Sequence, residues 1–302
     1  MLCSTIIPTI GRDTLSRAVE SALSQDLDPT EHEIIVVNDS GAPLAASAWM
    51  NSTQIRVMDT NRSRVCFASN AGAAAARGKY LKFLHDDDYL LDGALRSLIS
   101  EAESSGSCWI VGAMRVVDSQ GKLLHVETSQ DEGNLAALFV VGEIFHVSRS
   151  LIRRQDFLKV GGFDASVGMF EDRELEWRMA MVGEFGSTET MVACARVSCT
   201  QDSAYDAQKD GTRIQMIRDS RRIRERILNA EGANRRIRDS LHGKHHLRGR
   251  VCRAYMLSAA LRFCDAAVLV ALSRVVAALR LAAPGLVHRA FWAGLFGRRH
   301  FE

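Results

Sequence analysis

The sequence lacks the features of an extracellular, disulfide-stabilised protein. Its seven cysteines are odd in number and scattered, and none forms a Cys-x-x-Cys pair. This pattern indicates neither a disulfide framework nor a structural zinc site, so we expect a reducing, cytoplasmic compartment. No basic segment precedes the first apolar residues, 2–7, and we therefore expect no signal peptide.

The sequence also lacks an apolar run long enough to cross a membrane. We predict one apolar helix over residues 251–282, but Asp265, Arg274 and Arg280 interrupt it. Its uncharged stretch 266–273 falls far short of the ~20 apolar residues that a membrane span needs. The helix could instead lie on a membrane surface, pack on the rest of the chain, or pack on a second copy.

Basic residues are unevenly distributed along the chain. Residues 208–302 carry 20 Lys and Arg against 7 Asp and Glu, whereas residues 1–207 carry 18 against 29. A basic C-terminal region favours contact with an anionic surface, although a solvated helical face gives the same composition. It has no interleaved aromatic residues, so we expect no nucleic-acid binding. Peripheral contact with the cytoplasmic membrane face, or formation of a homo-oligomer, is the preferred interpretation.

Apolar, β-branched segments alternate with helix-favouring segments in the first third of the chain. This order predicts an α/β fold with a mostly parallel sheet, followed by a mixed α and β part on the same sheet. The predicted strands are 2–7, 33–38, 55–58, 80–84, 108–117, 122–126, 144–148 and 192–197. The predicted helices are 12–25, 68–77, 92–104, 171–181 and 214–228, followed by the apolar helix.

Polar residues follow three of the predicted strands, at Pro8-Thr9, Asn38-Asp39 and Asp86-Asp87-Asp88. Ligands of parallel sheets bind beyond the carboxyl ends of the strands, so we expect these clusters to converge. Three adjacent carboxylates are electrostatically costly, and a divalent cation would relieve them. An isolated run of acids could equally be a solvated helix N-terminus, which the helix dipole stabilises.

The run of acids belongs to an ordered set of motifs that resembles the family 2 glycosyltransferases. The set covers about residues 2–200. Its first members are Ser-Thr-Ile-Ile-Pro-Thr at 4–9, Glu-Ile-Ile-Val-Val-Asn-Asp-Ser at 33–40, Ser-Asn-Ala-Gly at 69–72, and the segment 76–89 that contains His-Asp-Asp-Asp. Its later members are Arg153-Arg154, Gly-Gly-Phe-Asp at 161–164, and Glu-Asp-Arg-Glu-Leu-Glu-Trp-Arg at 171–178.

The resemblance implies a GT-A fold, in which a Rossmann-like mixed sheet is flanked by helices. It implies a catalytic domain over residues 1–207, with residues 208–302 as a basic, partly amphipathic helical extension. The implied reaction is inverting transfer from a nucleoside-diphosphate sugar, with a UDP-sugar favoured. The acceptor would be a hydroxyl of a glycan, lipid-linked or polymer molecule in cell-surface polysaccharide synthesis.

The resemblance also assigns roles to individual residues. Asp172 matches the general base, Asp87 the holder of Mn²⁺ or Mg²⁺, and Asp88 is a second candidate for the metal. The donor would be bound by Pro8, Thr9, Arg12, Asp39, Asn70 and Asp86. Two of these residues have simpler explanations, because Thr9 could cap the first helix and Asp172 could be an acid in a helical first turn.

Three positions depart from the family pattern. His85 stands where an Asp is common, Ser69 where an Arg is common, and Gln201 near a position that often holds a His. The departures at His85 and Gln201 motivate a second hypothesis, a non-catalytic sugar-nucleotide-binding scaffold of a glycan assembly complex. A nucleotidyltransferase is disfavoured, since no Gly-rich basic loop follows the first strand. The remaining histidines that we considered lack ligand spacing and are expected to be structural or exposed: His146, His242, His245 and His246.

Overall fold

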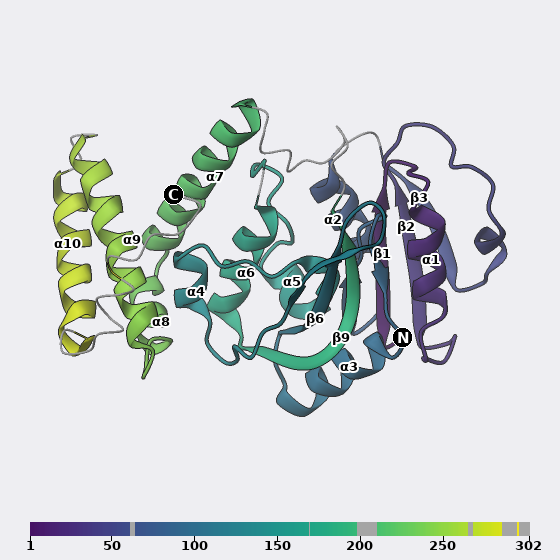
Figure 1. The fold of residues 1–302 in the computed structure, drawn as a ribbon, viewed down its shortest axis with the longest axis horizontal. Coiled ribbons are helices and arrows are strands. Elements are labelled where there is room, and N and C mark those ends of the chain that lie inside the picture. Colours follow the sequence, from purple (N-terminus) through teal and green to yellow (C-terminus); the bar gives the residue numbers. More distant parts are fainter. Residues whose placement is uncertain (61–63, 169, 198–209, 265–267, 286–294, 296–302) are drawn as a thin grey trace. The chain divides into compact units, whose positions relative to one another are not determined.

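The structure is a computed structural model that describes most of the 302 residues (Figure 1). The residues outside the description are 61–63, 169, 198–209, 265–267, 286–294 and 296–302. The described chain divides into two compact units. The first contains residues 1–133 and 145–216, and the second contains residues 134–144 and 217–302. The predicted domain boundary between residues 207 and 208 lies outside the described residues and stays a prediction.

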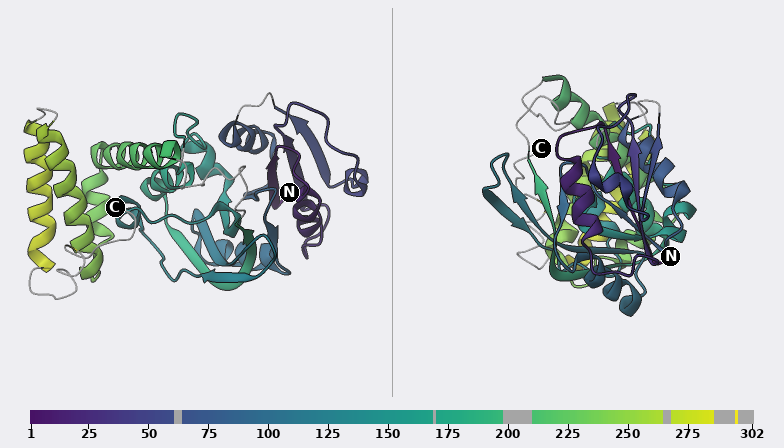
Figure 2. Two further views of the ribbon diagram at one scale, coloured as in Figure 1. Left: turned by 45° about the horizontal axis from the view of Figure 1, so that its top comes forward. Right: turned by 90° about the vertical axis from the view of Figure 1, so that its right-hand side faces the viewer.

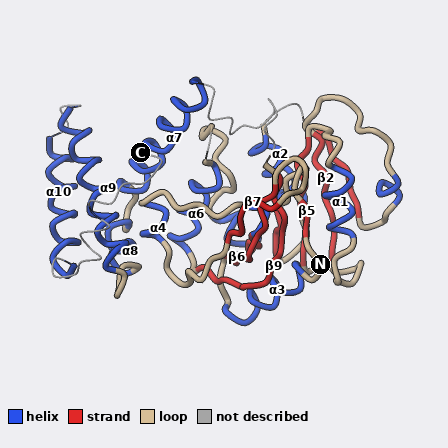
Figure 3. The backbone as a smooth tube through the Cα atoms, viewed as in Figure 1, coloured by secondary structure: helices blue, strands red, loops and turns tan. Residues whose placement is uncertain are grey.

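Four parallel strands form one half of the sheet in the first unit. They are β1 Cys3–Thr9, β2 His32–Asn38, β3 Ile55–Asp59 and β4 Tyr80–Phe83, in the order β3-β2-β1-β4. Figure 3 shows the strands of the sheet in red. Both β1 and β2 are buried along their whole length, because helices cover both faces of a parallel sheet and favour continuous apolar runs. These strands confirm the predicted α/β class.

Mixed pairing continues the sheet beyond β4. The order is β4-β8-β6-β9-β5, and β7 pairs with β6. Only the β6–β9 pair in this half is parallel. The strands are β5 Tyr89–Leu90, β6 Trp109–Val117, β7 Leu123–Glu127, β8 Ser150–Arg153 and β9 Phe185–Arg196. Together the nine strands of the described chain form the mixed sheet that the sequence predicts.

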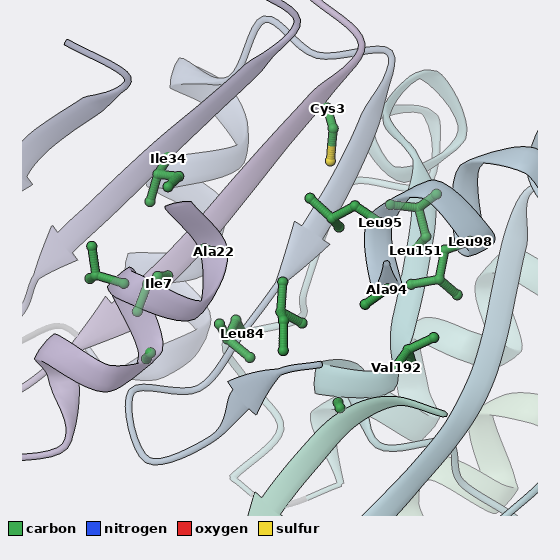
Figure 4. Packing of buried hydrophobic residues seen from close by; sticks show 14 of the residues in the cluster. Cys3, Ile7, Ala22, Ile34, Leu84, Ala94, Leu95, Leu98, Leu151 and Val192 are labelled. Carbon is green, nitrogen blue, oxygen red and sulfur yellow. The ribbon is translucent and has the colours of Figure 1, made fainter. Parts of the chain in front are cut away.

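Helices cover both faces of this sheet. Helices α1 Leu15–Leu23 and α3 Ala94–Ser105 bury their apolar faces in one core, with Ile7 of β1 (Figure 4). Helix α2 Val65–Ala75 lies on the opposite face, where a Cβ at Gly72 would come within 2.5 Å of the Ile6 side chain. Neighbouring strand residues point to opposite faces, which explains the separation of Ile6 and Ile7. The other helices of this unit are η1 Ala48–Asn51, η2 Val147–Arg149, α5 Arg154–Lys159 and α6 Glu171–Val182.

The predicted strand over residues 144–148 is wrong. Residues 147–149 form the 3-10 helix η2, and strand β8 begins only at Ser150. Local side-chain contacts replace strand pairing here. Lys82 donates to the carbonyl oxygens of Ser148 and Ser150, and the ring of His146 accepts the Ser148 N–H.

The predicted single helix over residues 251–282 is also wrong. The structure contains two helices, α9 His245–Cys264 and α10 Val268–Ala282, with the short turn η3 Ala283–Gly285 after them. They pack side by side and antiparallel (Figures 1 and 2). Arg248 donates to the Leu281 carbonyl and the Cys252 thiol to the Ala278 carbonyl, so the start of α9 lies beside the end of α10.

The second unit is helical, as predicted for the extension, but it includes a segment from the middle of the sequence. Its further helices are α4 Ala136–Val140, most of α7 Asp210–Asn229, and α8 Ala233–Asp239. Helix α4 packs against α8 and α9, and the Ala137 N–H donates to Ser240 Oγ at 3.1 Å. Within the described chain, no helix has both the length and the apolar content to cross a membrane.

Candidate active site

The three polar clusters predicted at the strand ends meet in the structure. Thr9 Oγ1 donates to Asp86 Oδ2 at 2.6 Å, although the two residues are 77 positions apart. The Asp39 N–H donates to the Thr9 carbonyl at 2.7 Å, because parallel pairing sets Thr9 opposite Asn38. The ends of β1, β2 and β4 thus build one polar site at the carboxyl edge of the sheet.

Asp86 is fixed at this edge by two partners. Its side chain is almost fully buried, and Arg12 Nη1 lies 2.5 Å from Oδ1 while Thr9 occupies Oδ2. Thr9 Oγ1 also accepts the Gly11 N–H at 2.9 Å. Helix α1 begins after Thr14, so the interpretation of Thr9 as a cap of this helix is wrong. The Thr9 hydroxyl and the Arg12 guanidinium are thus both held against the Asp86 carboxylate.

Asp39 is buried at the neighbouring strand end. Its Oδ1 accepts a hydrogen bond from Thr60 Oγ1 at 2.7 Å. Asn38 turns the other way and donates to Asp59 Oδ1 at 2.7 Å. The contrast follows from strand alternation, which directs consecutive side chains to opposite sides.

Asp172 lies in the first turn of α6 and lines a pocket. Phe170 adopts a left-handed backbone with φ of 63°, and this turn starts the helix. Burial, and next the charge of Glu171, raise the pKa of Asp172 to about 7, although His85 and the Val147 N–H oppose the shift. The pocket is lined by Pro8, Val65, Cys66, Ser69, Phe83, His85, Val147, Phe163, Glu171 and Asp172. Asp172 is only 9% exposed, so it is more than a solvated acid at a helix terminus.

The turn at residues 160–163 joins α6 to α2. Arg178 of α6 donates to the carbonyl oxygens of Val160 and Gly162 and forms a salt bridge with Glu174 at 2.5 Å. On the other side, the Asn70 amide donates to the Phe163 carbonyl at 2.8 Å and accepts the Phe163 N–H at 2.9 Å. Asn70 therefore positions the turn, and its predicted contact with a donor stays a prediction.

Asp88 lies between two histidines. Its Oδ2 is 3.8 Å from His85 Nδ1 and 3.8 Å from His146 Nδ1. Its Oδ1 accepts the Arg196 N–H at 3.1 Å. One ligand atom from each of His85, Asp88 and His146 lies within 4.8 Å of the others, which makes the three a candidate metal site.

This group changes the sequence interpretation in two respects. His146, expected to be structural or exposed, packs against His85 with ring centroids 5.1 Å apart. Asp87, the first choice for the metal, does not belong to this group of three, and its assignment stays a prediction. No motif spacing could reveal His146, because the segment before η2 brings it to the site.

The electrostatics of the group favour a cation. Burial disfavours the charged form of His85, but nearby carboxylates outweigh it and raise the pKa of the imidazole. These carboxylates are Asp88, Asp172, Asp87 and Glu171, in decreasing order of effect. Burial also raises the pKa of Asp88. Two imidazoles and a buried carboxylate with ligand atoms within 4.8 Å of one another fit the ligand types of a divalent metal ion, and of these atoms His146 Nδ1 already accepts the Ser148 N–H.

Two positions that depart from the family pattern have different outcomes. Ser69 is buried on α2 and lines the pocket, where it provides a short hydroxyl in place of an arginine. Gln201 lies outside the described residues.

The sequence is similar to known glycosyltransferases. The family model described as Glycosyl transferase family 2 matches residues 4–170. The succinoglycan biosynthesis protein ExoO of Rhizobium meliloti is 33% identical over 129 residues, which are 42% of this chain and 36% of ExoO. The poly(ribitol-phosphate) beta-N-acetylglucosaminyltransferase TarP of Staphylococcus aureus is 25% identical over 157 residues, which are 50% of this chain and 47% of TarP. The aligned parts thus span less than half of either relative.

A solved structure shares the fold over most of the chain. The crystal structure of S. aureus TarS 1-349 in complex with UDP-GlcNAc superimposes with a TM-score of 0.62, and the match covers 96% of this chain and 93% of that chain. The sequence identity is 15%, so the likeness shows the fold alone. It confirms the GT-A fold class predicted from the motifs.

Proposed function

This chain belongs to glycosyl transferase family 2, and on that premise we propose that it transfers a sugar from a nucleoside-diphosphate sugar to a hydroxyl acceptor with inversion. One observation carries the proposal. Asp172, a shielded carboxylate whose pKa is raised to about 7, lines the same pocket as Pro8 and His85 from the strand ends. A base of this kind suits proton removal near neutral pH.

The donor would bind at the strand ends. Asp39 would accept a hydrogen bond from the imide N–H of a uracil ring, as a carboxylate can. Thr9, Arg12 and Asp86 form a connected polar group beside it that would contact the ribose and phosphates. The fold shared with TarS, which was solved with UDP-GlcNAc, supports a UDP-sugar in particular.

Asp172 would act on the acceptor. It takes the proton of the acceptor hydroxyl while that oxygen forms a bond to the anomeric carbon. The bond from this carbon to the diphosphate oxygen breaks, and the nucleoside diphosphate leaves from the opposite face. A divalent ion such as Mn²⁺ or Mg²⁺, when bound, neutralises charge that develops on the diphosphate. The stereochemistry at the anomeric carbon inverts because attack and departure occur on opposite faces.

The acceptor would be a glycan, a lipid-linked saccharide or a polymer of the cell envelope. The names of the relatives support this class, since ExoO is a succinoglycan biosynthesis protein and TarP acts on poly(ribitol-phosphate). A Campylobacter jejuni relative that is 28% identical over 172 residues is a beta-1,3-glucosyltransferase of a PP-undecaprenol-linked glycan.

We further propose that residues 1–207 are the catalytic domain and that residues 208–302 contact the cytoplasmic membrane face. The supporting observation is an apolar stripe on α10. Leu272, Val276 and Leu279 are 48%, 45% and 63% exposed and lie at helical spacing. The homo-oligomer stays a prediction, because the same stripe could join two copies of the chain.

The experiment that tests the function is release of nucleoside diphosphate from a panel of UDP-, GDP- and dTDP-sugars. Wild type is compared with Asp172→Asn and with Asp131→Asn, an acid on an exposed loop. Catalysis is supported if the wild type and Asp131→Asn release nucleoside diphosphate at similar rates and the rate of Asp172→Asn is at least ~100-fold lower. Donor binding in a thermal-shift assay without turnover, even with acceptor extracts, would favour the non-catalytic scaffold instead.

A further inference from the structure

Glu176 is a fully buried acid on the same helix as the proposed base. It is 0% exposed and follows Asp172 by four residues, so the two side chains are neighbours one turn apart on α6. Its Oε1 accepts the Phe145 N–H at 2.8 Å. Burying an acid costs free energy that an apolar side chain at the same position would not, so packing alone does not explain a glutamate here.

The two acids of α6 hold one backbone segment. Asp172 accepts the Val147 N–H, and Glu176 accepts the N–H of Phe145, two residues earlier. His146 between them has φ of −59° and ψ of 126°, which is close to polyproline II. Two residues of such a chain span about 6 Å, and side chains four residues apart on a helix are about 5–6 Å apart. The spacing of the acids thus matches that of the N–H groups they hold.

The charged groups around Glu176 favour its neutral form. They are Asp172 and Arg173 of its own helix and Arg149 of η2. Burial, and next the charge of Asp172, raise the pKa of Glu176 well above its ordinary value, although the Phe145 N–H and the two arginines oppose the shift. A neutral carboxyl still accepts the Phe145 N–H through its carbonyl oxygen, and it does not repel the negative charge of an ionised Asp172.

We propose that Glu176 is a positioning residue for the base: it holds the Phe145 N–H and thereby fixes the segment whose Val147 N–H holds Asp172. This inference rests on the proposed function. It assigns the effect of Glu176 to its length and its acceptor oxygen, not to charge. Glutamine keeps both properties, aspartate is shorter by one methylene, and leucine has no acceptor.

The first experiment measures the segment itself, without donor or acceptor. Amide hydrogen exchange of Phe145 and Val147 is followed in the full chain of the wild type, Glu176→Gln, Glu176→Asp and Glu176→Leu. We expect exchange about tenfold faster in Glu176→Asp and Glu176→Leu and unchanged in Glu176→Gln. Melting temperatures show whether each variant is folded, and Glu176→Asp decides the result if Glu176→Leu is not. Exchange as slow as in the wild type in both Glu176→Asp and Glu176→Leu would overturn the proposal.

The second experiment measures transfer by the same variants. We expect kcat to fall about 10- to 100-fold in Glu176→Asp and Glu176→Leu, because a small displacement of a catalytic group is costly. The KM for the donor and the kcat of Glu176→Gln should stay close to the wild-type values. Glu20→Leu, at an exposed acid on α1, is the matched control and should match the wild type. The opposite order, with Glu176→Asp active and Glu176→Gln inactive, would show a role of charge and overturn the proposal.

The pH profile separates positioning from a merely structural role. The Val147 N–H favours the ionised form of Asp172, so its displacement in Glu176→Leu should move the acidic limb of kcat/KM to higher pH. Glu176→Gln should leave the limb in place, and a shift to lower pH would show that Glu176 is ionised and would overturn the proposal.

Failure of the positioning role is distinct from failure of the proposed function. Turnover that Asp172→Asn abolishes but Glu176→Leu leaves unchanged would contradict the positioning role alone. Absence of turnover in the wild type, with the expected pattern of amide exchange, would contradict the proposed function and still support the hold of Glu176 on the segment.

Discussion

Lys82 Nζ donates a hydrogen bond of 2.5 Å to the Ser148 carbonyl oxygen, inside a fully buried part of the first unit. The same ammonium also donates to the Ser150 carbonyl at 3.1 Å. A lysine in the middle of β4 thereby fixes the segment that begins β8. This segment also carries the Val147 N–H, which holds the carboxylate of Asp172. A buried lysine thus connects the sheet to the proposed base.

Lys82→Met should destabilise the protein and slow turnover. The variant leaves buried carbonyl oxygens without a donor, which should cost at least about 2 kcal/mol in the free energy of unfolding. Denaturant unfolding measures this change, and kcat should fall as the Val147 segment loosens. Lys79→Met, at an exposed lysine paired with Glu103, is the control and should change neither quantity much. Equal stability of both variants would contradict the role of Lys82.

The rate of transfer should depend on the ionisation of Asp172. Burial raises the pKa of this carboxyl to about 7, so the proton-accepting form is lost as the pH falls below that value. We expect kcat/KM to fall about tenfold per pH unit on the acidic side. A cation bound beside His85 and His146 would stabilise the ionised form of Asp172 and lower its pKa, so the acidic limb of the pH profile would move to lower pH. A profile that stays flat from pH 8 to pH 5 would contradict the assignment.

The same shift predicts that the proposed base destabilises the fold at high pH. The pKa of Asp172 is higher in the folded than in the unfolded chain, so the folded state binds its proton more tightly. The stability contributed by this group is present below about pH 4 and is lost as the pH rises through about 7. Asp172→Asn keeps an acceptor for the Val147 N–H and should melt at a higher temperature than wild type at pH 8. The difference should shrink toward pH 4, and calorimetry at both pH values measures it.

The sequence predicts the convergence of the polar strand ends well, because that convergence follows from strand position alone. Thr9 is the last residue of β1, Asp39 directly follows β2 and Asp86 follows the end of β4, and parallel strands end at one edge. No long-range information is needed to bring them together. The hydrogen bond between Thr9 and Asp86 shows that the predicted convergence is close.

The sequence does not predict the parts that depend on long-range contacts. The apolar pattern over residues 144–148 is typical of a strand, but bonds from Lys82 hold the chain in a 3-10 turn. Helix α4 is buried by α8 and α9, which follow much later in the sequence. The sequence between Cys264 and Val268 contains neither glycine nor proline, so no local signal predicts two helices in place of one.

Thr9→Val should weaken donor binding more than it slows the chemical step. Valine has nearly the shape of threonine, but it cannot donate to Asp86 or accept the Gly11 N–H. Loss of a hydrogen bond to a charged group costs about 1.5–3 kcal/mol, which is about 10- to 150-fold in affinity. Calorimetric titration with UDP, and KM against kcat for the donor, separate the two effects. Thr30→Val on an exposed loop is the control. Unchanged UDP affinity would remove Thr9 from the donor site.

Membrane attachment should depend on the apolar stripe of α10. Deleting residues 208–302 is a poor test, because α4 packs on α8 and α9 and its apolar side chains would be uncovered. Point changes keep that packing intact. Leu272→Ser, Val276→Ser and Leu279→Ser combined should abolish flotation with anionic liposomes, while the melting temperature stays close to that of wild type. Ser273→Ala on the same helix is the control. A membrane-binding face must lose lipid affinity when its exposed apolar area is removed. If the triple variant still floats with liposomes but no longer forms a dimer in sedimentation experiments, the stripe is a contact between two copies of the chain.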